Sequence, residues 1–105
     1  MKVELDHIGI AIEDIDEALA FYRDALGLDI EATEEVISQG VRAHFMAGGK
    51  SAIELLEPTT LDSPVGRFLK RRGPGLHHLT LRVDDLNAML TRLKERGIRL
   101  IDEKP

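Results

Sequence analysis

The sequence predicts an α+β fold made of two related strand–helix units. Residues 6–15 and 77–86 resemble each other. Each has a histidine at or next to its start, continues with alternating apolar residues, and ends with an acidic pair followed by a hydrophobic residue. Each then continues with apolar residues at helical spacing and stops at a glycine, Gly27 or Gly97. Segments between the units alternate as strands do. We therefore expect one small domain of paired βαβββ modules: 1–105 overall, 1–73 for the first module, and 74–105 for the second, which is incomplete.

The first expected strand covers about residues 2–12. Successive side chains of a strand point to opposite faces, so the alternation assigns two faces here. The face that we expect to pack on a helix consists of Ile8, Ile10 and Ile12. The opposite face consists of His7, Gly9 and Ala11.

The next segment supplies the helix that this isoleucine face needs. Asp14 is a favourable N-cap and Glu17 follows three residues later, which is the capping-box pattern. Ser63 followed by Pro64 indicates the start of a second, short helix through Lys70. The remaining elements of the first module are strands expected over 28–37, 41–46 and 51–57, with a hairpin turn at 47–50.

The second unit has a strand from Leu76 and a helix that ends at Gly97, and Ile98–Ile101 looks like the beginning of another strand. We expect Leu79, Leu81 and Val83 to pack on this helix. Comparison with the first unit leaves the second unit two strands short. We interpret the chain as truncated, or as a domain whose sheet is completed by something outside this sequence.

The same alternation selects a group of polar side chains. His7 and His78 occupy the faces opposite their helices, and Glu54 joins them if Ile53 and Leu55 face the helix layer. His77 has the parity of Leu79 and should lie on the helix side or at the strand edge, so the repeat selects His78 over it. Two imidazoles and a carboxylate can hold a divalent metal ion with positions left open. Separate structural roles for each histidine, and a solvent-facing Glu54, are the alternative interpretation.

Composition excludes several classes of function. The chain has no cysteine, so disulfides, thiolate metal sites and thiol nucleophiles are excluded. Its net charge is −5, which argues against binding to nucleic acid. No apolar run is long enough to cross a membrane, so we expect a cytoplasmic protein without a membrane partner.

One basic run stands out in this acidic chain. Lys70, Arg71 and Arg72 follow one another at the end of the second predicted helix. They are either a solvated helix end favoured by the helix dipole or a clamp for a phosphate-bearing ligand.

Several segments, taken together, resemble the vicinal oxygen chelate superfamily of glyoxalases, bleomycin-resistance proteins and dioxygenases, and most closely its methylmalonyl-CoA epimerase branch. The segments are Leu5–Ala11, Gln39–Val41, Ile53–Pro58, Leu61–Val65 and Gly75–Leu79. The resemblance implies paired βαβββ modules in a curved mixed sheet around a divalent metal of cobalt, manganese or zinc type. It implies metal ligands at His7, Glu54 and His78, and a fourth, glutamate ligand on a strand that this sequence lacks.

The activity implied by this resemblance is epimerisation of methylmalonyl-CoA by removal of the proton alpha to the thioester. Glu54 is the candidate proton acceptor, and Lys70, Arg71 and Arg72 are candidate contacts for the coenzyme A portion. The resemblance also implies a second base, proposed in some members, on the strand after Gln39-Gly40, where this chain has Ala43. Two alternatives stay open: a lactoylglutathione lyase of the glyoxalase I type, and a metal-free module that binds small molecules. We also expect a homodimer, or a partner strand, at the free edge of the second module.

Overall fold

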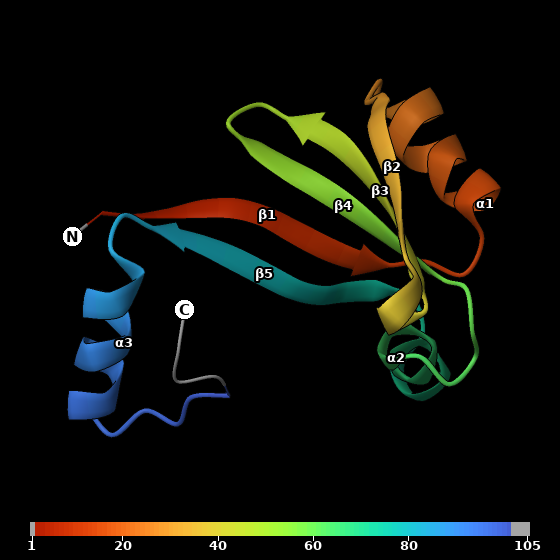
Figure 1. Ribbon diagram of the computed structural model, residues 1–105. Coiled ribbons are helices and arrows are strands. Elements are labelled where there is room, and N and C mark those ends of the chain that lie inside the picture. Colours follow the sequence, from red (N-terminus) through yellow and green to blue (C-terminus); the bar gives the residue numbers. More distant parts are fainter. Residues whose placement is uncertain (1, 102–105) are drawn as a thin grey trace.

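The computed structural model describes residues 2–101, and its centre is a curved five-stranded mixed sheet (Figure 1). The strands lie side by side in the order β2 (Ile30–Val36), β3 (Val41–Gly48), β4 (Ser51–Pro58), β1 (Val3–Ala11) and β5 (Gly75–Val83). Strand β1 is parallel to β4 and antiparallel to β5, and the other pairs are antiparallel. The predicted α+β class is confirmed, and the junction of the two predicted units is the β1–β5 pair.

One helix covers one face of this sheet. Helix α1 (Ile15–Leu19) continues into a π-helical segment, η1 (Ala20–Ala25). The Asp14 side chain caps it by accepting hydrogen bonds from the backbone N–H groups of Asp16 and Glu17, at 2.8 and 3.4 Å. The predicted N-cap is therefore confirmed. We call the covered face the α1 face; its core residues are Ile12, Leu19, Met46 and Leu55.

A second helix closes one end of the opposite face. Helix α2 (Pro64–Arg72) begins at Ser63, whose hydroxyl accepts a hydrogen bond from the Gly66 N–H at 3.0 Å, as the Ser-Pro pair predicts. We call this the α2 face; its core residues are Ala11, Val41, Ala43, Leu56 and Val65. A short 3-10 turn, η2 (Ile37–Gln39), joins β2 to β3. The two cores divide the alternating side chains of β1 and β4 as predicted.

The second unit departs from the prediction at its helix. Helix α3 (Leu86–Glu95) has an N-cap at Asp85 but no buried residue, and Leu79 and Leu81 are each 54% exposed. They are therefore not buried beneath α3 as we expected. A helix with its side chains is roughly 10 Å wide, whereas strands are about 4.8 Å apart, so a helix needs more than one strand beneath it. Alongside β1, the described part of the second unit offers only β5.

The expected strand at Ile98–Ile101 is also wrong, because the structure has no strand there. Apolar character alone does not create a strand without a neighbour to accept its backbone hydrogen bonds. Residues 102–105 of the second module lie outside the described part of the chain. Among residues 2–101 no helix is both long and apolar enough to cross a membrane.

Candidate metal centre

Strand register places the three predicted ligands around one glycine. Gly9 of β1 pairs with Glu54 of β4 on one side and with His78 of β5 on the other. His7 lies two residues before Gly9 and therefore shares its face. One possible ligand atom from each of His7, Glu54 and His78 lies within 4.8 Å of the other two. The structure thus brings together the three side chains that alternation selected.

Gly9 provides the space for one of these rings. A Cβ atom at this position would lie 2.3 Å from Cε1 of His78 and 2.7 Å from both ring nitrogens. Real contacts of a Cβ atom are never this short, so the absence of a side chain at Gly9 is what allows the His78 imidazole to lie over β1.

Each of the two strands has a β-bulge beside its histidine. In β1, Leu5 pairs with Leu81 and His7 with Thr80, which leaves Asp6 as the extra residue. In β5, His78 pairs with Gly9 and Leu76 with Ile10, which leaves His77 as the extra residue. A bulge breaks the alternation of faces and redirects a side chain.

His77 is therefore not on the α1 face, where its parity placed it. Its Nδ1 lies 2.9 Å from Nδ1 of His78, and its ring packs edge-on against Phe68 of α2 with centroids 5.0 Å apart. The sequence shows that His77 and His78 are neighbours. It does not show the bulge in β5, which puts both rings on the α2 face.

Hydrogen bonds fix the orientation of His7. Its Nδ1 lies 2.7 Å from Oδ2 of Asp6, and its Nε2 lies 3.2 Å from Oε2 of Glu54. The Thr80 hydroxyl is 3.1 Å from the same Nε2. An ionised Asp6 can only accept a hydrogen bond, so the proton of the ring belongs on Nδ1 and Nε2 is the nitrogen left for a metal.

This donor set suits a cation. In the tautomer with the proton on Nδ1, two acceptors, Nε2 of His7 and the Glu54 carboxylate, lie 3.2 Å apart, and a cation beside them would favour this arrangement. A divalent metal is such a cation and prefers imidazole and carboxylate ligands. A second proton on His7 would occupy the same place, so metal and proton compete for it.

The surroundings favour unprotonated His78 and ionised Asp6. Burial, and after it the neighbouring His77, lowers the pKa of His78, so the ring is neutral and available as a ligand near pH 7. The hydrogen bond from His7, supported by the Arg82 guanidinium, lowers the pKa of Asp6. Strand alternation did not select Asp6, Arg82 or His77 as site residues. Only their positions next to His7 and His78 in the sequence pointed to Asp6 and His77.

The basic run lies at the end of α2 rather than among the ligands. Lys70, Arg71 and Arg72 are exposed in the last turn of this helix, one turn beyond Phe68. Because Phe68 contacts His77, α2 borders the candidate centre while its basic end faces solvent.

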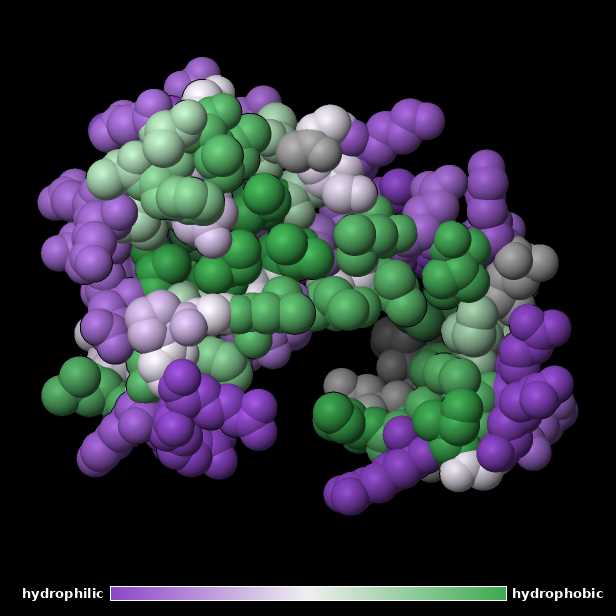
Figure 2. All heavy atoms as spheres, turned by 180° about the vertical axis from the view of Figure 1, so that it is seen from behind, coloured by the Kyte–Doolittle hydropathy of each residue, from purple (hydrophilic) through white to green (hydrophobic). Residues whose placement is uncertain are grey.

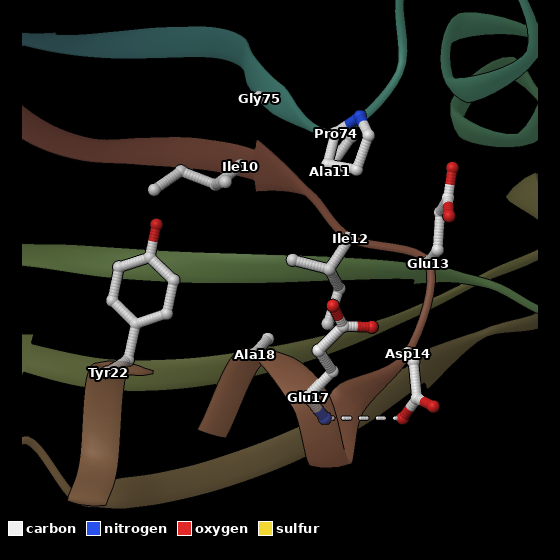
Figure 3. Close-up of a pocket in the computed structure, with 10 residues that line it drawn as sticks. All are labelled: Ile10, Ala11, Ile12, Glu13, Asp14, Glu17, Ala18, Tyr22, Pro74 and Gly75. Carbon is white, nitrogen blue, oxygen red and sulfur yellow. Dashed lines mark hydrogen bonds between the residues drawn. The ribbon is translucent and has the colours of Figure 1, made fainter. Parts of the chain in front are cut away.

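A hollow of about 350 Å³ lies on the other face of the sheet (Figure 3). Ile10 and Ile12 line it together with Ala18 and Tyr22 of the α1–η1 helix, and Pro74 and Gly75 close one side. These isoleucines belong to the α1 face, so the hollow is not part of the candidate metal centre.

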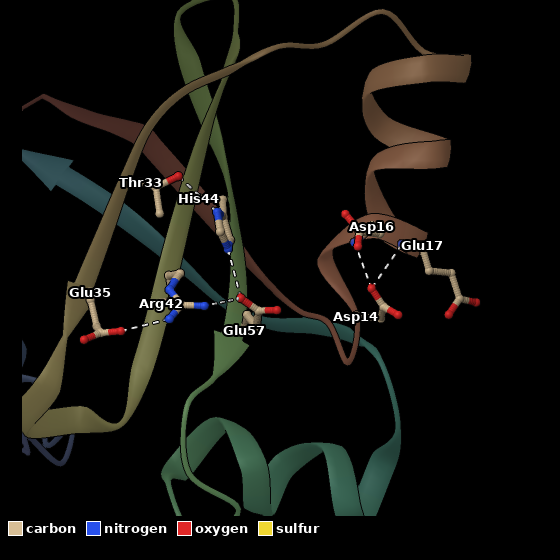
Figure 4. A network of polar contacts seen from close by, with 8 residues as sticks. All are labelled: Asp14, Asp16, Glu17, Thr33, Glu35, Arg42, His44 and Glu57. Atoms are coloured by element: carbon tan, nitrogen blue, oxygen red, sulfur yellow. Dashed lines mark hydrogen bonds and ion pairs between the residues drawn. The ribbon is translucent and has the colours of Figure 1, made fainter.

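The fourth histidine also belongs to the α1 face. His44 is 6% exposed, and its two ring nitrogens meet the Thr33 hydroxyl at 3.1 Å and the Glu57 carboxylate at 3.3 Å. Arg42 joins Glu57 to Glu35 in the same network (Figure 4). Both ring nitrogens of His44 are thus used within the fold, and the sequence analysis assigned it no functional role.

Comparisons with known proteins agree on the family. The model of the glyoxalase/bleomycin resistance protein/dioxygenase superfamily matches residues 6–105. A protein of unknown function from Bacillus subtilis is 43% identical over 96% of this chain and 72% of its own length. Human mitochondrial methylmalonyl-CoA epimerase is 37% identical over 95% of this chain, which spans only 57% of that enzyme.

Solved structures give the same result. A variant of the Streptomyces coelicolor methylmalonyl-CoA epimerase in complex with 2-nitronate-propionyl-CoA has a TM-score of 0.84 and 37% identity. That match covers 97% of this chain and 75% of the Streptomyces chain.

Proposed function

The chain belongs to the glyoxalase/bleomycin resistance protein/dioxygenase superfamily, and we propose that it is a metal-dependent epimerase of methylmalonyl-CoA. The observation that best supports this is the convergence of His7, Glu54 and His78 around Gly9, in a chain that is similar to methylmalonyl-CoA epimerases along most of its length. The acyl-CoA bound to the Streptomyces relative supports an acyl-CoA substrate.

In this proposal His7, Glu54 and His78 hold a divalent ion of cobalt, manganese or zinc type. Such an ion supplies positive charge to oxygen atoms of the substrate. The residues of the chain orient that charge: Asp6 fixes one imidazole, Gly9 makes space for the other, and burial keeps His78 neutral.

The chemical step that we propose is a proton transfer. The C–H bond alpha to the thioester carbonyl breaks, its electron pair moves toward the carbonyl oxygen, and the proton goes to a carboxylate oxygen. Glu54 is our candidate for that carboxylate, since it is 12% exposed and lies within the cluster. A water molecule on the opposite face of the carbon gives it a proton as the electron pair moves back from the carbonyl oxygen, which inverts the centre. The hydroxide that is left takes the proton from Glu54.

We also propose that Lys70, Arg71 and Arg72 contact the phosphates of coenzyme A. They are exposed at the end of the helix that borders the candidate centre, and guanidinium groups bind phosphate in a bidentate manner. Their replacement by glutamine should raise KM for the acyl-CoA and leave kcat unchanged. A fall in kcat with unchanged KM would contradict this role.

Exchange of the alpha proton tests the proposed activity. Methylmalonyl-CoA incubated in D₂O with the protein and Co²⁺ should lose its alpha-proton NMR signal, and His7→Ala and His78→Ala should abolish that loss. His44→Gln is the matched control, since His44 lies on the other face and should leave exchange intact. Wild-type protein that exchanges no proton with metal present would refute the proposal.

The same experiment separates the two alternatives. Turnover of a glutathione hemithioacetal without exchange on methylmalonyl-CoA would support a lactoylglutathione lyase. Binding of a small molecule without metal, and unaltered in His7→Ala, would support a metal-free binding module. We retain the cytoplasm as the predicted compartment.

We further propose a homodimer. Strand β5 is an edge of the described sheet, and Leu5, Leu76, Leu79 and Leu81 are exposed on β1 and β5. Figure 2 shows the resulting band of apolar side chains between the helical ends of the molecule. Exposed edges and apolar bands of this kind are typical of interfaces. Sedimentation should give twice the 11.7 kDa chain mass, and a species of single-chain mass would contradict the dimer.

A further inference from the structure

We propose that Asp6 is a positioning residue, presented by the bulge of β1 and held by Arg82, which keeps Nε2 of His7 free to bind the cation. This role rests on the proposed metal site, because it concerns how one of its ligands is oriented. Three features of the structure support this role: the place where the bulge puts Asp6, the partners of its two carboxylate oxygens, and the effect on the ring of His7.

The bulge explains how a sequence neighbour reaches the ligand. In a regular strand, Asp6 and His7 would point to opposite faces of the sheet. Asp6 has no partner on β5, and its Oδ2 reaches Nδ1 of His7 at 2.7 Å. The irregularity in β1 therefore has a visible consequence at the ligand.

Arg82 restrains the carboxylate of Asp6. Nη1 of Arg82 donates to Oδ1 of Asp6 at 2.7 Å, and Nη2 of Arg82 donates to Glu4 at 3.0 Å. With Oδ2 on His7 and Oδ1 on Arg82, rotation of the carboxylate would break one contact or the other. A carboxylate that is merely solvated would not have this restriction.

The restrained carboxylate selects one tautomer of His7. It accepts the proton on Nδ1, so the neutral tautomer that it favours has no proton on Nε2, the nitrogen that lies 3.2 Å from Glu54. Which ring nitrogen can bind a metal is set by the hydrogen bond that the other nitrogen makes. The alternative is that Asp6 only forms a surface ion pair with Arg82 and has no influence on the tautomer of His7.

Two measurements on the whole protein distinguish these roles. In metal-free protein, the ¹⁵N shifts of the His7 ring should report the Nδ1–H tautomer, and Asp6→Ala should shift the population toward Nε2–H. By calorimetry, Asp6→Ala should bind Co²⁺ about 10–100-fold more weakly, the usual effect of losing such a partner. Asp6→Asn keeps an acceptor oxygen and should restore both the tautomer and most of the affinity.

Glu4→Gln is the matched control, because Glu4 binds the same guanidinium without touching His7. It should leave the tautomer and the Co²⁺ affinity unchanged. An effect as large as that of Asp6→Ala would overturn the proposal, because it would show that any negative charge near Arg82 has the same effect on His7. Thermal unfolding of the metal-free variants checks that each is folded.

The outcomes separate this inference from the metal site itself. If wild-type protein binds Co²⁺ and His7→Ala does not, while Asp6→Ala matches the wild type in affinity and tautomer, the positioning role alone is wrong. If wild-type protein binds Co²⁺ no better than His7→Ala, the metal site is wrong and this role with it.

Discussion

At the scale of single residues, Gly9 illustrates how a missing side chain creates a site. The His78 imidazole lies where a Cβ of residue 9 would be, and Glu54 and His78 both pair with Gly9 in the sheet. Dense packing leaves no room for one more methyl group unless a neighbour moves. The neighbour that would have to move here is the His78 ring, which is itself a candidate ligand.

Gly9→Ala should therefore displace His78 and weaken Co²⁺ binding. The loss should be at least the roughly 10–100-fold that follows when a metal ligand loses its hydrogen-bond partner. It should also destabilise the metal-free protein in the wild-type background but much less in His78→Ala, since the clash needs the ring. Urea unfolding of the four proteins in this double-mutant cycle measures the coupling. Additive effects of the two substitutions would show that the clash is not the cause.

His78 also gives the metal-free protein a dependence on pH. Its pKa is lowered in the folded state, chiefly by burial, from an unfolded value of about 6.5. Between the two pKa values the unfolded chain binds more protons, so the free energy of unfolding rises with pH and has its full value above about pH 6.5. Unfolding in EDTA at pH 5.5 and 7.5 should show this rise, and His78→Gln should reduce it. An equal rise in both proteins would assign it to other groups.

At the scale of elements, helix stability depends on local caps that the sequence reveals. Asp14 caps the α1–η1 helix by accepting hydrogen bonds from two backbone N–H groups. Helix α3 also has an N-cap, but it has little surface on which to pack. A cap determines where a helix begins, and tertiary packing determines how firmly it is held.

Asp14→Ala should lower the free energy of unfolding by roughly 0.5–2 kcal/mol, because the N–H groups of Asp16 and Glu17 lose their acceptor. Asp14→Asn should recover most of this loss, since asparagine is an equally good N-cap. Chemical denaturation of the three proteins provides the measurement. If Asp14→Asn is as unstable as Asp14→Ala, the negative charge rather than the cap is what matters.

At the scale of the whole molecule, the candidate centre joins strands that are far apart in sequence. His7, Glu54 and His78 come from β1, β4 and β5, so an ion bound to all three ties the second unit to the first. A ligand that binds only the folded state stabilises it by an amount that depends on its concentration relative to Kd.

Co²⁺ at a free concentration of 100 Kd should therefore raise the free energy of unfolding by about 2.7 kcal/mol, and EDTA should remove this gain. His7→Gln should lose the gain. His44→Gln should be less stable without metal, because Thr33 and Glu57 lose their partner, but should keep the full gain. The same metal-dependent gain in His7→Gln would place the ion elsewhere.

Features that depend on neighbours along the chain follow from the amino-acid sequence alone. Alternation placed His7 and Ile10 on opposite faces of β1, and the Asp14 and Ser63 caps marked helix starts. These follow from the two-residue period of strands and from local hydrogen bonds.

Features that depend on pairing between distant segments became visible in the folded chain and not before. The bulges at Asp6 and His77 arise in the register of β1 against β5, some seventy residues apart in sequence, and they moved His77 to the face that its parity had excluded. The loose packing of α3 has the same origin, since a helix is held by the breadth of sheet beneath it and not by its own sequence.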